Sequence, residues 1–145
     1  MTGGEEAGFM VMTMRDVMTH RLVTIAPETV CDEARRLMEQ HRIRHLPVVA
    51  DGRLVGMLSD RDVRSAAPGA TTGRVMTPDP VTVTAEMRVE HAARVMLEAR
   101  FGSLPIVEGG ALIGIVTYSD LLEALVQVME TATQERIAVD FSGGR

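Results

Sequence analysis

The chain of 145 residues contains nearly the same sequence twice. Val17-Met18-Thr19 returns as Val75-Met76-Thr77, a shift of 58 positions, and this shift aligns Val17–Val63 with Val75–Leu121 without a gap. Seventeen of these 47 aligned positions are identical. A gapless repeat of this length indicates a duplicated structural unit, and two units too small to bury a full core are expected to pack against each other. We therefore expect binding sites in the clefts between the halves.

Both repeats follow one order of elements. In the first, Leu22–Ile25 is expected to be a strand, and Val30–His41 carries apolar residues at helical spacing. Two Val-rich runs then flank Asp51-Gly52, a dipeptide that favours the type I′ turn of a hairpin. A second helix begins after each hairpin. The pattern β-α-β-β-α, read twice, predicts an α/β fold of the α+β type in which two repeats form a pseudo-twofold pair.

The repeat boundaries divide the chain into five parts. We expect a flexible N-terminal lead-in, a first repeat, a Gly- and Thr-rich linker, a second repeat, and a C-terminal helix extension with a tail. The last helix is expected to run from Asp120 to about Ala138. The five parts are residues 1–13, 14–65, 66–73, 74–126 and 127–145.

Composition excludes several classes of protein. The net charge of −5 argues against nucleic-acid binding, which needs a basic face. A single cysteine, Cys31, excludes an intramolecular disulfide and fits a reducing compartment. No signal peptide is visible, and no apolar run approaches the roughly 18 residues of a membrane span. A soluble, cytoplasmic protein without a membrane partner is expected.

The turn from each hairpin into the second helix carries the polar chemistry. Ser59-x-x-Asp62 in the first repeat returns as Thr117-x-x-Asp120 in the second. A helix start offers unpaired amides and a positive dipole end to a phosphate, and a carboxylate can accept hydrogen bonds from a ribose diol. Gly56 lets another group approach the strand closely. The same spacing also describes a helix cap, and spacing alone leaves the ribonucleotide pocket and the cap about equally supported.

These motifs resemble the paired CBS domain, or Bateman module. The resemblance rests on Val-Met-Thr at the head of each repeat, on His45–Val49 and Ser103–Val107, and on Gly-x-x-Ser/Thr-x-x-Asp, all present twice in register from about Asp16 to Leu125. No appended catalytic domain is visible, so the chain resembles a stand-alone CBS pair. The resemblance implies a regulatory module that binds AMP, ADP, ATP or S-adenosylmethionine, with no obligatory cofactor. It also implies a homodimer that forms through helices.

The resemblance also suggests roles for individual residues. Asp62 and Asp120 would hold ribose hydroxyls, and Ser59 and Thr117 would lie at the ribose-phosphate end. Two strand segments and the two Leu-Pro pairs would line the base and supply backbone contacts. These wall residues are Thr24, Ile25, Thr82, Val83, Leu46, Pro47, Leu104 and Pro105.

The two copies differ in charge near the motif. The first repeat has Arg42, Arg44, His45, Arg61 and Arg64, where the second has Arg100, Gly102, Ser103, Tyr118 and Ser119 around the same positions. Arginine binds phosphate through paired hydrogen bonds. We therefore expect the cleft at Ser59–Asp62 to prefer phosphorylated ligands, and we include Arg44, His45, Arg61, Ser103 and Ser119 among the candidate contacts. Arg42 fits a solvated helix end equally well.

Other readings of the sequence are weaker. Cys31, His41 and His45 lack the close spacing and the repeat-two counterparts of a zinc site, so no metal is expected. No Ser-His-Asp elbow, Walker loop or HExxH motif indicates an enzyme. The main alternative is a dimeric scaffold or interaction protein with vestigial clefts. The far end of the last helix, residues 129–138, could pack on a partner subunit or on an unidentified protein target.

Overall fold

The computed structural model describes residues 11–143, and side chains as far as Glu135. Each repeat contains an amphipathic helix, a two-stranded hairpin and a second helix. In the first repeat these are α3 (Cys31–His41), β1 (His45–Ala50), β2 (Arg53–Ser59) and α4 (Asp60–Arg64). In the second they are α6 (Val89–Ala99), β4 (Ser103–Glu108), β5 (Ala111–Thr117) and α7 (Tyr118–Gly143). The shift of 58 positions therefore holds for the start of every element in this series, and the mixed helix-and-sheet fold is confirmed.

The two hairpins have the same detailed geometry. Asp51 and Gly52 have φ angles of 52° and 76°, and Gly109 and Gly110 have 59° and 84°. Positive φ at both central residues is the type I′ turn predicted from the sequence. Each hairpin is also irregular at the same place, after Val48 in one and after Ile106 in the other. The duplication thus preserves the strand register as well as the order of elements.

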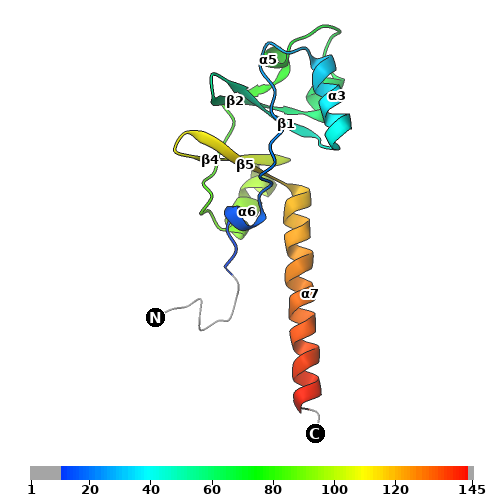
Figure 1. The fold of residues 1–145 in the computed structure, drawn as a ribbon, viewed down its shortest axis with the longest axis vertical. Coiled ribbons are helices and arrows are strands. Elements are labelled where there is room, and N and C mark those ends of the chain that lie inside the picture. Colours follow the sequence, from blue (N-terminus) through cyan, green and yellow to red (C-terminus); the bar gives the residue numbers. More distant parts are fainter. Residues whose placement is uncertain (1–10, 144–145) are drawn as a thin grey trace.

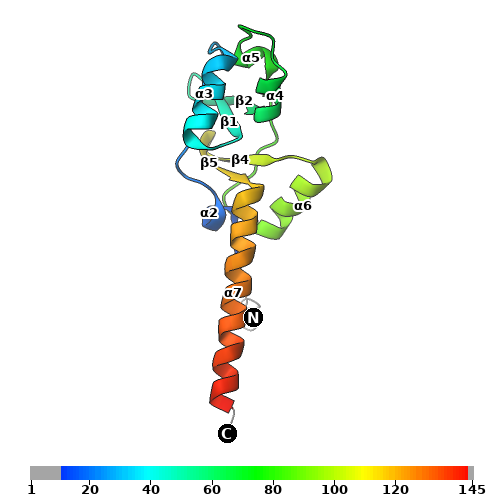
Figure 2. The same ribbon diagram turned by 90° about the vertical axis from the view of Figure 1, so that its right-hand side faces the viewer.

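Each half of the molecule contains one sheet, and the two sheets lie next to each other where the halves meet. Figure 1 shows α3 beside β1 and β2 in one half and α6 in the other, with the β4–β5 hairpin between them. A short strand, β3 (Thr77–Pro78), extends the first sheet in the order β1-β2-β3. Figure 2 shows that α7 projects well beyond the body of the protein.

The segments at the head of the repeats are exchanged between the two cores. We call residues 13–19 the first head segment and residues 71–77 the second. Helix α2 (Met14–Val17) belongs to the first, yet Met14 and Met18 are buried in the core of the second repeat. Helix α5 (Thr72–Val75) belongs to the second, and Met76 packs on the core of the first repeat. Each repeat therefore completes the hydrophobic core of the other.

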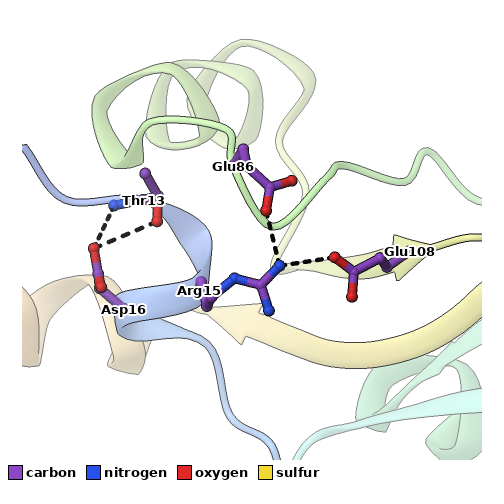
Figure 3. A network of polar contacts seen from close by, with 5 residues as sticks. All are labelled: Thr13, Arg15, Asp16, Glu86 and Glu108. Carbon is purple, nitrogen blue, oxygen red and sulfur yellow. Dashed lines mark hydrogen bonds and ion pairs between the residues drawn. The ribbon is translucent and has the colours of Figure 1, made fainter.

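Polar contacts hold the first head segment in place. Figure 3 shows Arg15 between Glu86 and Glu108, with Nη2 2.8 Å from a carboxylate oxygen of each. The backbone N–H of Thr13 donates to Asp16 Oδ2 at 2.8 Å, which caps α2. The two carboxylates raise the pKa of Arg15. All of these side chains are solvent-exposed, so they orient the segment more than they stabilise it.

Three local expectations differ from the structure. The strands expected at residues 22–25 and 81–84 are reduced to single parallel bridges, Ile25 with Val48 and Val83 with Ile106. Residues 1–10 of the lead-in lie outside the described residues, but Thr13 bridges to Arg88 and caps a helix. Helix α7 reaches Gly143 rather than Ala138, and residues 144–145 lie outside the description.

One buried hydroxyl offers a test of the core. Thr72 aligns with Met14 in the repeat and is fully buried, but its hydroxyl has no hydrogen-bond partner within the described residues. Valine has the same shape without the polar atom. We expect Thr72→Val to increase the free energy of unfolding by about 1 kcal/mol, because an unsatisfied buried polar group destabilises by about 1–3 kcal/mol.

Chemical denaturation measures this change. Thr24→Val, at an exposed position, is the matched control and should stay within about 0.5 kcal/mol of the wild type. A less stable Thr72→Val protein would mean that the hydroxyl has a partner.

Candidate functional site

The protein has two clefts that correspond through the repeat. The first cleft contains the strand-to-helix turn Met57–Asp62 and has a volume of about 660 Å³. The second contains Ile115 and residues 117–119, and has a volume of about 520 Å³. Both volumes lie in the range of small-molecule binding sites, about 300–1,000 Å³.

Each cleft takes its two sides from different repeats. In the first cleft the turn of repeat one faces Thr77 and residues 79–81, which follow the second head segment. In the second cleft the turn of repeat two faces Thr19 and residues 21–23. The exchanged head segments cause this arrangement, because they carry the chain across to the opposite half. A ligand in either cleft would contact both repeats.

The proline pairs are also exchanged. Pro105 of the second repeat lines the first cleft, and Pro47 of the first repeat lines the second cleft. The sequence predicted a base-contacting role for both prolines. It did not indicate that each serves the cleft built on the other repeat's turn.

Ser59 and Asp62 form a reciprocal cap at the start of α4. Asp62 N–H donates to Ser59 Oγ at 3.1 Å, and Ser59 N–H donates to Asp62 Oδ2 at 2.9 Å. The capping role considered from the sequence is therefore present. It uses one carboxylate oxygen of Asp62, and a carboxylate has about four acceptor sites. Asp62 lines the first cleft, so it can accept further hydrogen bonds there.

Asp120 is more fully occupied than Asp62. Its Oδ2 accepts from Thr117 N–H at 2.9 Å, as in the first repeat. Thr19 Oγ1 also lies 3.1 Å from Oδ1 and 3.3 Å from Oδ2. Asp120 is not among the residues that line the second cleft. The carboxylate of the second repeat thus has fewer sites free for a ligand.

Both clefts carry arginines. Four of them line the first cleft, Arg44, Arg61, Arg64 and Arg100, together with the carboxylates of Asp60, Asp62 and Asp79. The second cleft is lined by Arg21, Arg42 and Arg44, with no acidic residue among its described lining. This corrects the grouping expected from the sequence, since Arg42 faces the second cleft and Arg100 faces the first. Arg42 also forms the left-handed end of α3, with φ of 56°, so it has the helix-end role as well.

His45 lies at the start of β1 and lines both clefts. Burial lowers the pKa of its imidazole, and nearby Arg44 lowers it further. Asp62 and Asp60 act in the opposite direction but do not reverse the change. The neutral form, with one N–H donor and one acceptor nitrogen, is therefore favoured at neutral pH.

The remaining candidate residues fall into three groups. Arg44, His45, Ser59, Arg61, Ser103, Thr117 and Ser119 line a cleft, and their contacts with a nucleotide stay a prediction. Ile25, Leu46, Val83 and Leu104 are buried in the two cores rather than in a cleft wall. Thr24 lies on the surface outside both clefts, and Thr82 lines a separate shallow groove.

The backbone of the buried residues is occupied as well. Ile25 N–H donates to Pro47 O at 3.1 Å, and Ile25 O accepts from Val49 N–H at 2.9 Å. Val83 makes the equivalent pair with Pro105 and Val107. These bonds correct the expectation that both positions offer backbone contacts to a base. The segments that do line the clefts, residues 21–23 and 79–81, lie two to three positions earlier.

Sequence reasoning also missed Phe101 and Tyr118. Phe101 lines the first cleft, and Tyr118 lines both. Aromatic faces at such positions can stack on a flat base. Aromatic residues make up only 3% of the chain, and this scarcity was the one signal in the sequence that could have drawn attention to these two.

The structure also bears on metal sites and membrane-spanning helices. In residues 11–143, no three or more His, Cys, Asp or Glu side chains lie close enough together to hold a metal ion. None of the helices in the same part of the chain has the length and apolar character needed to cross a bilayer.

Known proteins share this architecture. The CBS domain family model matches residues 14–69 and 73–127. An inosine-5′-monophosphate dehydrogenase from Korarchaeum cryptofilum is 41% identical over 102 residues, which are 69% of this chain and 21% of that enzyme, so the chain spans about a fifth of its length. CBSX2 of Arabidopsis thaliana, solved in complex with AMP, is 35% identical with a TM-score of 0.75, over 81% of this chain and 98% of that one.

A second solved structure is the CBS domain pair of protein MJ0100 in complex with 5′-methylthioadenosine and S-adenosyl-L-methionine. It is 25% identical with a TM-score of 0.77, over 81% of this chain and 98% of that one. Two family matches in register with the internal repeat, together with these structures, show that this chain belongs to the CBS domain family and carries two CBS domains as a tandem pair.

Proposed function

We propose that the protein is a ligand-sensing regulatory module that binds adenosine-containing nucleotides in its clefts, and that it acts in the cytoplasm without catalysing a reaction. The ligands in view are AMP, ADP, ATP and S-adenosylmethionine. One observation carries the proposal: the first cleft brings the carboxylate of Asp62, with one oxygen outside the cap, a capped helix start and four arginines together beside apolar walls. The AMP complex of CBSX2 supports the same ligand class.

Each part of the first cleft matches a part of a nucleotide. Asp62 has acceptor sites for the ribose hydroxyls. The arginines offer paired donors to phosphate oxygens. Pro80, Val81 and Phe101 provide apolar surface for the base. The negative net charge of the chain does not exclude phosphate binding in this cleft, because four arginines line it beside three aspartates.

The cleft construction supports a sensing role. In each cleft a ligand would contact the turn of one repeat and a segment of the other, residues 79–81 or 21–23. It can keep both sets of contacts only while the two repeats hold one relative arrangement. A ligand shifts the population toward the arrangement that it binds more tightly. A partner protein or an attached domain could then respond to the altered packing.

Asp62→Asn tests the site. We expect a loss of AMP affinity of about 10- to 100-fold, because a hydrogen bond to a charged group contributes about 1.5–3 kcal/mol. Asparagine retains a side-chain oxygen for the cap on Ser59, so the fold should persist. Isothermal titration calorimetry with AMP, ADP, ATP and S-adenosylmethionine measures the affinities.

Asp120→Asn is the matched control for this variant. It should reduce the affinity of the tighter site by less than threefold, because Asp62 lines the first cleft whereas Asp120 lines neither cleft. Equal losses from the two variants, or from Arg61→Ala and Asp120→Ala, would contradict the preference for the first cleft. A thermal midpoint that no nucleotide raises at millimolar concentration would contradict nucleotide binding altogether.

A second candidate function, a dimeric interaction protein with vestigial clefts, is favoured by one observation. An apolar groove of about 630 Å³ lies between α6 and α7 and is lined by Val89, Leu97, Leu121, Leu122, Leu125 and Val128, among others. Leu97 is 72% exposed and Leu122 is 61% exposed. Contiguous apolar surface of this kind marks an interaction site. We propose that a second copy of the chain covers it, whichever function the clefts have.

A further inference from the structure

Four residues belong to the walls of both clefts: Arg44, His45, Gly102 and Tyr118. In the repeat, Arg44-His45 aligns with Gly102-Ser103. Two large polar side chains in one copy therefore correspond to two small residues in the other. The boundary between the clefts is thus asymmetrical in the pseudo-twofold pair.

The imidazole of His45 fills the space left by the missing side chain at Gly102. A Cβ atom added to Gly102 would lie 2.8 Å from His45 Nε2 and 3.1 Å from Cε1. Both distances are shorter than van der Waals contact, so any side chain at position 102 would displace the ring. The ring of His45, resting on the backbone of the other repeat, is thus a wall one side chain thick between the two clefts.

The chemistry of His45 differs from that of its neighbour Arg44. A guanidinium has five N–H donors and can serve two ligands together. The neutral imidazole has one N–H donor and can serve only one. Asp60 and Asp62 of α4 and the adjacent Arg44 are the charged groups that face the ring, and burial favours its neutral form. Two bound ligands would therefore compete for a single hydrogen-bond donor.

We propose that His45 couples the two clefts negatively: a ligand that takes its N–H in one cleft, and orients the ring there, binds at the expense of a ligand in the other. This inference rests on nucleotide binding as proposed above. It makes the module respond over a wider range of ligand concentration than two independent sites would. It also assigns to His45 a role that its counterpart Ser103 does not have.

Single-cleft variants measure the coupling. Calorimetry of AMP binding to Ser119→Glu, whose added carboxylate repels a phosphate in the second cleft only, gives the association constant of the first cleft alone, and Arg61→Glu gives that of the second in the same way. If the clefts are independent, the product of these two association constants equals the product of the two stepwise association constants of the wild type. With negative coupling we expect the wild-type product to be smaller by about fivefold or more, the lower end of typical coupling between sites.

Two further variants test whether the imidazole ring of His45 is responsible for the coupling. His45→Ser gives the first repeat the residue of the second and should bring the two products within twofold of each other. Gly102→Ala should have the same effect by displacing the imidazole, while every polar group of both clefts is retained. Repeating the single-cleft variants in each background supplies the reference constants, and thermal midpoints verify folding.

The outcomes separate this inference from the proposed function. Equal products in the wild type contradict the coupling while leaving nucleotide binding intact. A fivefold difference that persists in both His45→Ser and Gly102→Ala also contradicts the role of His45. Absence of AMP binding to the wild type contradicts both proposals. A wild-type difference that disappears in both variants supports the shared wall.

Discussion

Replacing Gly56 with alanine is expected to reduce the free energy of unfolding by about 1–3 kcal/mol, the usual effect of overpacking a well-filled core. Gly56 does not have the positive φ that would demand glycine. The constraint is space, because an added Cβ would meet Met76 Sδ, lie 2.9 Å from Met76 Cγ and lie 2.9 Å from the carbonyl oxygen of Thr77. The backbone of Thr77 cannot move away without disturbing the pairing of β3 with β2.

Gly114→Ala is the matched control in the other repeat. There the added Cβ would meet only side-chain atoms of Met18, with Cγ at 3.0 Å and Cβ at 3.3 Å, and no backbone atom is among the nearest neighbours. A methionine side chain adapts more readily than a peptide group. We therefore expect a smaller loss for Gly114→Ala, and urea denaturation of both proteins measures the difference.

The same variants test the exchange of head segments. If Met18 packs against Gly114, the destabilisation from Gly114→Ala should be partly relieved in a Met18→Ala background, with a coupling of about 0.5–3 kcal/mol for residues in contact. The corresponding coupling between Gly56 and Met76 should be weaker, because the Thr77 carbonyl still obstructs the new methyl group. Additive effects for Met18 and Gly114 would show that the head segments do not pack as described.

Local features of the fold were predictable from the sequence. The type I′ turn at Asp51-Gly52 follows from the backbone freedom of that dipeptide, and its copy at Gly109-Gly110 follows from the repeat. The cap between Ser59 and Asp62 follows from the three-residue spacing. Each of these depends on a few neighbouring residues, and short-range geometry decides them.

The exchange of the head segments was not predictable in the same way. Hydrophobic spacing shows that Met14 and Met18 are apolar positions, but it does not say which core receives them. Either repeat offers a glycine, Gly56 or Gly114, against which a methionine can pack. Only the path of the chain between the halves decides the partner.

The candidate site was likewise predictable where it depends on neighbouring residues and not where it depends on the path of the chain. The carboxylates and hydroxyls at the helix starts were found because their chemistry and their spacing both repeat. The wall for the base was misplaced by two or three residues, since a strand was expected at Leu22–Ile25 and the structure has a single bridge at Ile25. Residues that come from the opposite repeat, such as Arg100 in the first cleft, carry no local signal of their role.

The apolar face of α6 and α7 leads to the second large prediction, which concerns the oligomeric state. Leu122, Leu125 and Met129 are 61%, 55% and 59% exposed on α7, and Leu122 and Leu125 line the groove together with Leu97 of α6. A homodimer with twofold symmetry would bring the same face of each copy together. We expect the wild type to sediment as a dimer in analytical ultracentrifugation.

Leu122→Glu should shift the protein to a monomer and weaken dimerisation by at least 100-fold. A buried charge without a partner destabilises an interface by several kcal/mol, and two symmetry-related copies would be introduced at once. Gln127→Glu is the matched control, because Gln127 is exposed on the same helix but does not line the groove. It adds the same charge and should leave the dimer intact. Since Leu122 is exposed within one chain, both variants should retain the thermal midpoint of a folded monomer. A dimer that survives Leu122→Glu, or a wild type that is monomeric at micromolar concentration, would show that a second copy does not cover this face.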